Sequence, residues 1–137
     1  MATLANRIAG LPFLSYGFRP FFLLGSAWAG LEVLAWLPMF EGRLSLATVF
    51  IPRDWHAHEL LFGYVPAVIA GFLLTAIPNW TGRRPVRGLL LAGLLAAWMA
   101  GRIAITASEA LGWMPAMLLD ASFLVLTAAT EIGRAHV

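Results

Sequence analysis

Apolar residues of this chain are concentrated in four long runs that are separated by short polar segments. The first three runs lie at about 21–40, 59–78 and 88–107, and the fourth covers about 113–131. Each run is about 20 residues long, which at the helical rise is enough to cross the roughly 30 Å hydrocarbon core of a bilayer. The runs are too long and too uniformly apolar for barrel strands, in which apolar and polar residues alternate. The pattern therefore predicts an all-α, polytopic transmembrane bundle with four spans, the fourth cut short.

Composition agrees with a membrane class. Hydrophobic residues make up 61% of the chain and charged residues 12%, so we treat residues 1–137 as a single transmembrane region whose surroundings are a lipid bilayer. The basic residues are all arginine, and their position in the loops argues for a role in orientation and against nucleic acid as a partner. The chain has no cysteine, which excludes disulfides, thiolate metal sites and cysteine nucleophiles.

The end of the fourth run departs from the apolar pattern. Residues 132–137 read Ile-Gly-Arg-Ala-His-Val, which matches the translation of a common sequencing adapter. We interpret them as a non-native tail, so that Arg134 and His136 carry no function and further transmembrane helices of the parent protein are missing. A genuine short C-terminus is the alternative.

Arginines in the polar segments predict how the chain crosses the membrane. The head contains Arg7 and Arg19, and the second loop contains Arg83, Arg84 and Arg87 without an acid. The positive-inside rule assigns both segments to the cytoplasm. We therefore expect a multi-pass protein with a cytoplasmic N-terminus and with its first and third loops outside.

The segment Trp55-His56-Ala57-His58-Glu59 lies where the first loop enters the second apolar run. Imidazole is a frequent ligand of metals and of haem iron, so His56 and His58 are candidate metal or haem ligands on the outer side. The alternative is that both rings only anchor a helix end at the level of the lipid headgroups.

Helical geometry separates the two rings. At 100° per residue, His56 and Glu59 share a face with a stripe of small residues, and such a stripe favours the side that faces the bundle. The stripe consists of Gly63, Ala67 and Gly71. His58 lies about 200° away from His56. Both rings could then bind one metal only if the helix began after His58, and otherwise they would serve different centres.

Ionisable residues inside the spans form a second candidate site. Glu32, Arg102 and Asp120 lie at similar depths, roughly 8–12 Å below the outer surface, beneath Glu59. A charge at that depth is costly unless it is paired. Because a short turn joins the third and fourth spans, we expect them to be antiparallel neighbours, with Arg102 paired to Asp120 directly or through Glu32. The four residues would form an intramembrane polar pocket, and a plain Arg102–Asp120 clip between spans is the alternative.

Two weaker signals concern proline and methionine. Pro66 lacks a backbone donor and is expected to kink the second span near Phe62. Met39, Met114 and Met117 gather near the outer ends, where thioethers could hold Cu(I), although methionine as core filler is far more common.

Three motifs resemble the NnrS family. They are the aromatic-proline run at residues 16–25, the Trp-His-Ala-His-Glu run at residues 55–59, and the apolar run at residues 70–76 together with Pro-Asn-Trp-Thr-Gly at residues 78–82. The resemblance implies a longer bacterial inner-membrane protein that carries haem b and copper and is associated with nitric oxide stress, of which this chain is the N-terminal part. It maps His56 and His58 onto the histidine motif of the family without assigning a metal to either residue, and it leaves open whether the protein is an enzyme.

The leading hypothesis is therefore a haem- and copper-binding membrane protein of the nitrosative stress response. His56 is the preferred haem ligand because it shares the face of the small-residue stripe. The first alternative is a secondary transporter or channel in which Glu32, Arg102 and Asp120 line a polar path. A second alternative is a structural subunit whose polar residues only pack helices together.

Overall fold

The computed structural model describes residues 2–135, and every regular element in this part of the chain is a helix. Four helical stretches are long and apolar enough to cross a membrane: Phe18–Phe40, Pro52–Thr81, Leu89–Thr106 and Trp113–Arg134. This confirms the predicted all-α transmembrane class and places the spans close to the expected runs.

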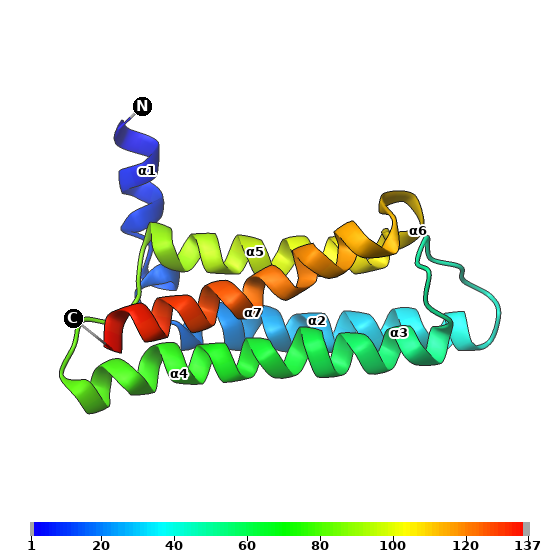
Figure 1. The fold of residues 1–137 in the computed structure, drawn as a ribbon, viewed down its shortest axis with the longest axis horizontal. Coiled ribbons are helices and arrows are strands. Elements are labelled where there is room, and N and C mark those ends of the chain that lie inside the picture. Colours follow the sequence, from blue (N-terminus) through cyan, green and yellow to red (C-terminus); the bar gives the residue numbers. More distant parts are fainter. Residues whose placement is uncertain (1, 136–137) are drawn as a thin grey trace.

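The long helices run side by side as a bundle (Figure 1). Helix α5 (Leu89–Thr106) packs most extensively on α7 (Trp113–Ala135), and α2 (Phe18–Phe40) packs on the second span. The short helix α6 (Ser108–Leu111) joins α5 to α7, which makes these two helices neighbours as expected.

The second span begins earlier than its hydropathy predicts. Helix α3 (Pro52–His58) starts within the expected first loop, so both histidines lie inside a helix and not at its entrance. Pro52 suits this start because the first helical position needs no backbone donor, and Ile51 before it is extended. The first turn of this helix contains two charged residues, Arg53 and Asp54, so it does not belong to an apolar run.

An irregular turn interrupts the second span. Between α3 and α4 (Val65–Thr81) the backbone of Glu59–Tyr64 (η2) is π-helical. This π-helical turn contains Phe62, where Pro66 was expected to kink the span, and the kink itself stays a prediction. π-Helical turns are rare and occur frequently at functional sites, because they change the direction in which successive side chains point.

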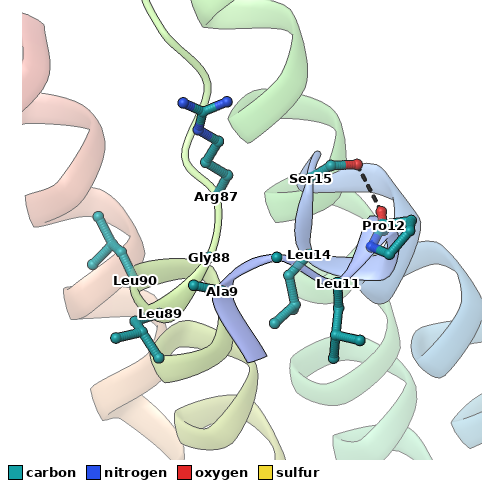
Figure 2. A pocket seen from close by; sticks show the side chains of 10 residues that line it. Ala9, Leu11, Pro12, Leu14, Ser15, Arg87, Gly88, Leu89 and Leu90 are labelled. Atoms are coloured by element: carbon teal, nitrogen blue, oxygen red, sulfur yellow. Dashed lines mark hydrogen bonds between the residues drawn. The ribbon is translucent and has the colours of Figure 1, made fainter. Parts of the chain in front are cut away.

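The head of the chain forms helical structure that the apolar pattern did not predict. Helix α1 (Ala2–Ala9) projects outward from the end of the bundle at a steep angle to the long helices (Figure 1), and the 3₁₀ turn η1 (Pro12–Leu14) follows it. The backbone N–H of Gly88 donates to the Leu14 carbonyl at 2.9 Å, which ties the head to the start of α5. A cavity of about 580 Å³ opens there between the head and the start of α5 (Figure 2).

The C-terminal part of the described chain continues α7 without a break to Ala135. Arg134 donates a hydrogen bond to the backbone carbonyl of Arg84. The interpretation of residues 132–137 as a non-native tail stays a prediction, and His136 lies outside the described residues.

Candidate functional site

The second span carries three chemically active side chains at the end of the bundle where α3 and α6 lie (Figure 1). His56 bonds to α2, His58 bonds to α7, and Glu59 receives hydrogen bonds from both α2 and α5. The two histidines therefore contact different helices, as their helical spacing predicts.

His56 is held from one side only. Its Nδ1 bonds to Oε1 of Glu32, whose side chain is 2% exposed. Since a carboxylate only accepts hydrogen bonds, Nδ1 is the donor. The imidazole stacks on the indole of Trp36, with ring centroids 4.3 Å apart and planes inclined by 19°. The Nε2 atom takes part in no hydrogen bond of the described residues, and the side chain is 26% exposed.

Arg102 is the centre of a separate ionic cluster. Its side chain is 1% exposed, and NH1 donates to Oε2 of Glu59 at 2.8 Å while NH2 donates to Oδ1 of Asp120. The indole N–H of Trp28 donates to the same Glu59 oxygen at 2.9 Å. The expected direct pair between Arg102 and Asp120 is thus confirmed, and Glu59 provides the second carboxylate.

His58 completes this ionic cluster. Its Nδ1 lies 3.3 Å from Oε1 of Glu59, and its Nε2 lies 3.2 Å from Oδ2 of Asp120. The imidazole also packs between the rings of Phe50 and Phe62, with centroids 5.3 and 5.1 Å away. Both ring nitrogens of His58 therefore face carboxylates, which distinguishes this ring from that of His56.

The expectation that Glu32 shares a polar pocket with Glu59, Arg102 and Asp120 stays a prediction, and the structure shows only that Glu32 does not bridge Arg102 and Asp120. Glu32 bonds to His56 and makes neither a hydrogen bond nor an ion pair with Arg102 or Asp120. Its second oxygen, Oε2, is buried without a hydrogen-bond partner. Depth along the helix axes places groups at one level, but it does not say toward which neighbour each one points.

Two glycines allow the helices to approach closely enough for the cluster to form. A Cβ atom on Gly63 would overlap the guanidinium of Arg102, with Cζ 3.1 Å away. A Cβ atom on Gly101 would lie 3.0 Å from Cα of Asp120. Real Cβ atoms rarely come so near other heavy atoms, so glycine at these positions makes room for the ionic contacts.

Two tryptophans have roles that the sequence did not reveal. Trp98 lies in the hydrophobic core and Trp28 packs against it, and both also donate hydrogen bonds, Trp28 to Glu59 and Trp98 to the Gly63 carbonyl, each at 2.9 Å. The sequence could have indicated these hydrogen bonds, because a tryptophan in the middle of an apolar span has an indole N–H that needs an acceptor there.

His56 and His58 differ in whether they have a ring nitrogen available to bind a metal. The described residues contain no group of three or more His, Asp or Glu side chains that could hold a metal ion. A haem needs less from the protein, because the porphyrin supplies four ligands and a histidine the axial one. The free Nε2 of His56 fits that requirement. His58 does not present a free nitrogen, and Arg102 already occupies both neighbouring carboxylates.

The methionines named as candidate Cu(I) ligands differ in their exposure. Met114 and Met117 are exposed on α7, whereas Met39 is buried in a core cluster with Trp55 and Ile105. Copper binding, which the family resemblance implies, stays a prediction.

Comparison with known proteins identifies one family. The model of the family described as NnrS protein matches residues 12–136, which include all four membrane-spanning helices and both histidines. No curated protein and no solved structure matches the chain.

Proposed function

We propose, from the premise that this chain belongs to the NnrS family, that it binds haem b in a bacterial inner membrane and serves the response to nitric oxide. In this proposal the imidazole of His56 would hold the haem through its iron. The observation that carries it is the free Nε2 on a ring whose other nitrogen is held by Glu32. The bound haem supplies an iron centre to which a diatomic gas can coordinate.

His58 has a secondary place in this proposal. Its Nε2 would reach iron or copper only after Asp120 had released it, and the guanidinium of Arg102 beside that carboxylate disfavours a second cation. We therefore assign the iron to His56 and a position in the ionic cluster to His58.

An absorption spectrum tests the haem assignment. The protein is purified from haem-replete cells in mild detergent, as wild type, His56→Ala and His58→Ala. We expect a Soret band with b-type features in the wild type, its loss in His56→Ala, and its retention in His58→Ala. Size-exclusion profiles show whether each variant is folded.

Two outcomes would overturn this assignment. A folded but colourless wild-type protein would reject haem binding by this chain. A Soret band that survived in His56→Ala and disappeared in a folded His58→Ala would move the ligand to His58.

The transporter alternative has less support from the geometry. Arg102 is enclosed by Glu59 and Asp120, and the charged groups of the cluster bond to one another. Glu32, which that alternative placed on the same path, pairs elsewhere. A mutually paired cluster stabilises helix packing and leaves no charged side chain free to coordinate a passing ion.

We further propose that the arginine-rich end of the bundle faces the cytoplasm. The head and the loop between α4 and α5 lie together at that end (Figure 1). Since the chain has no cysteine, single cysteines label specifically. In whole cells we expect Ser45→Cys to react with a membrane-impermeant maleimide and Thr81→Cys to stay unlabelled until the cells are lysed. The reverse pattern would invert the orientation.

A further inference from the structure

Glu32 is a buried carboxylate with too few partners for a purely structural role. One of its oxygens accepts from His56, and the other is buried with no hydrogen-bond partner. Burying a charged group without full pairing is costly, and in membrane spans such groups usually mark function. By contrast, the equally buried Glu59 faces three donors, on Trp28, His58 and Arg102.

The pair determines which nitrogen of His56 carries the proton. The Glu32 carboxylate accepts the hydrogen from Nδ1, so the lone pair of the neutral ring is on Nε2. A histidine that ligates a metal commonly donates its other N–H to a carboxylate, which fixes the tautomer and makes the ligating nitrogen more basic.

Trp36 fixes the plane of the same ring. It lies one helical turn after Glu32 on α2, and its indole stacks on the imidazole with an interplanar angle of 19°. The carboxylate therefore restricts the ring at one atom and the indole restricts it over one face. Together they leave one nitrogen available in a defined direction.

We propose that Glu32 and Trp36 are positioning residues for His56, holding the tautomer and the ring orientation in which Nε2 presents its lone pair to a haem iron. This inference rests on the proposed function. The negative charge of Glu32 increases electron donation by the imidazole, so it stabilises ferric over ferrous iron and lowers the reduction potential of the haem.

The first test uses the protein without haem. Histidine-labelled apoprotein is studied by ¹⁵N NMR, with His56 assigned from the His56→Ala spectrum. We expect Nδ1 of His56 to be the protonated nitrogen in the wild type and a mixture of tautomers in Glu32→Ala. Glu41→Gln, an exposed acid just after the end of the same helix, is the control and should leave the signals unchanged.

The second test uses the haem-loaded protein. Glu32→Gln keeps an acceptor oxygen but removes the charge, so we expect bound haem with a higher reduction potential than in the wild type. Glu32→Ala should lower haem affinity by about 10–100-fold, as is typical when an outer-shell partner is removed. Trp36→Leu should broaden the signals of the ferric haem in electron paramagnetic resonance, because the plane of the axial ring is no longer fixed.

The outcomes separate this inference from the proposed function. If the wild type binds no haem, the proposed function fails, while the apoprotein test still decides whether Glu32 sets the tautomer. If haem is lost in His56→Ala but Glu32→Gln changes neither tautomer nor potential, the proposed function stands and the positioning role is rejected.

Discussion

His56 and His58 lie two residues apart on one helix, yet their surroundings differ. The difference is whether the ring nitrogens and the neighbouring carboxylate oxygens have hydrogen-bond or ion-pair partners. The His56 region contains one carboxylate, one imidazole and a stacked indole, with Nε2 of the ring and Oε2 of Glu32 unpaired. The His58 region contains two carboxylates and the Arg102 guanidinium, and both ring nitrogens face oxygen atoms.

This contrast separates two uses of buried charge in a membrane protein. In the His58 region both carboxylates and both ring nitrogens are paired, although Nε of Arg102 is buried without a hydrogen-bond partner, and the contacts join α2, the second span, α5 and α7. In the His56 region, Nε2 of a rigidly held ring has a lone pair and no hydrogen-bond partner. A histidine that binds haem iron needs such a nitrogen. The same pair of residue types thus supports packing in one place and offers coordination in the other.

The largest effect is expected from removing the cation of the paired cluster. Arg102→Met removes the guanidinium that Glu59 and Asp120 share and leaves them only His58 as a common partner, which should destabilise the fold by roughly 3–5 kcal/mol. The measurement is the midpoint of thermal unfolding in detergent. Arg43→Met is the matched control, because the Arg43–Glu41 pair is exposed and should contribute little. A similar midpoint in both variants would show that the cluster does not hold the helices together.

Equivalent changes of a carboxylate to an amide compare the two regions directly. Glu59→Gln weakens hydrogen bonds to Arg102 and Trp28, so we expect a loss of about 1.5–3 kcal/mol. Glu32→Gln neutralises a buried carboxylate that has one oxygen without a partner. The loss of unfolding free energy should therefore stay below about 1 kcal/mol. Equal losses of stability in the two variants would remove the distinction between them. Thermal unfolding under the same conditions measures both.

A third test concerns the space that the cluster requires. Gly63→Ala places a methyl group against the Arg102 guanidinium and should cost about 1–3 kcal/mol. Gly30→Ala is the control, since a Cβ atom there meets no other atom within 4 Å. That control should be neutral or stabilise the helix by about 0.5–1 kcal/mol. If Gly63→Ala and Gly30→Ala changed the unfolding midpoint by the same amount, the space beside Arg102 would not be the reason for glycine at position 63.

The smallest effect is expected from the indole that donates to Glu59. Trp28→Phe keeps an aromatic ring but deletes one of several donors to this carboxylate, so a loss of about 0.5–1.5 kcal/mol should follow. Trp80→Phe, at a largely exposed indole, provides the baseline. If Trp28→Phe matched that baseline, Arg102 and His58 alone would account for the stability of Glu59.

Several features of the site could be predicted from the sequence because they follow from spacing along helices. The short connection after α5 and the depths of Arg102 and Asp120 were sufficient to predict their ion pair, which the structure contains. The pairing of Glu32 with His56 was not predicted. It depends on an early helix start at Pro52, and charged residues in that first turn hid the start from the hydropathy pattern.

By itself the sequence determined the membrane class, the number of described spans and the presence of costly charges among them, because these depend on the length and polarity of contiguous segments. Only the tertiary structure decided which charges meet. Partner choice depends on the rotation of each helix about its axis, and that rotation is set by the π-helical turn, by the close contacts at Gly63 and Gly101, and by donors such as Trp28 from other helices. One histidine is therefore enclosed by carboxylates and the other keeps a free nitrogen, although their positions in the sequence are nearly equivalent.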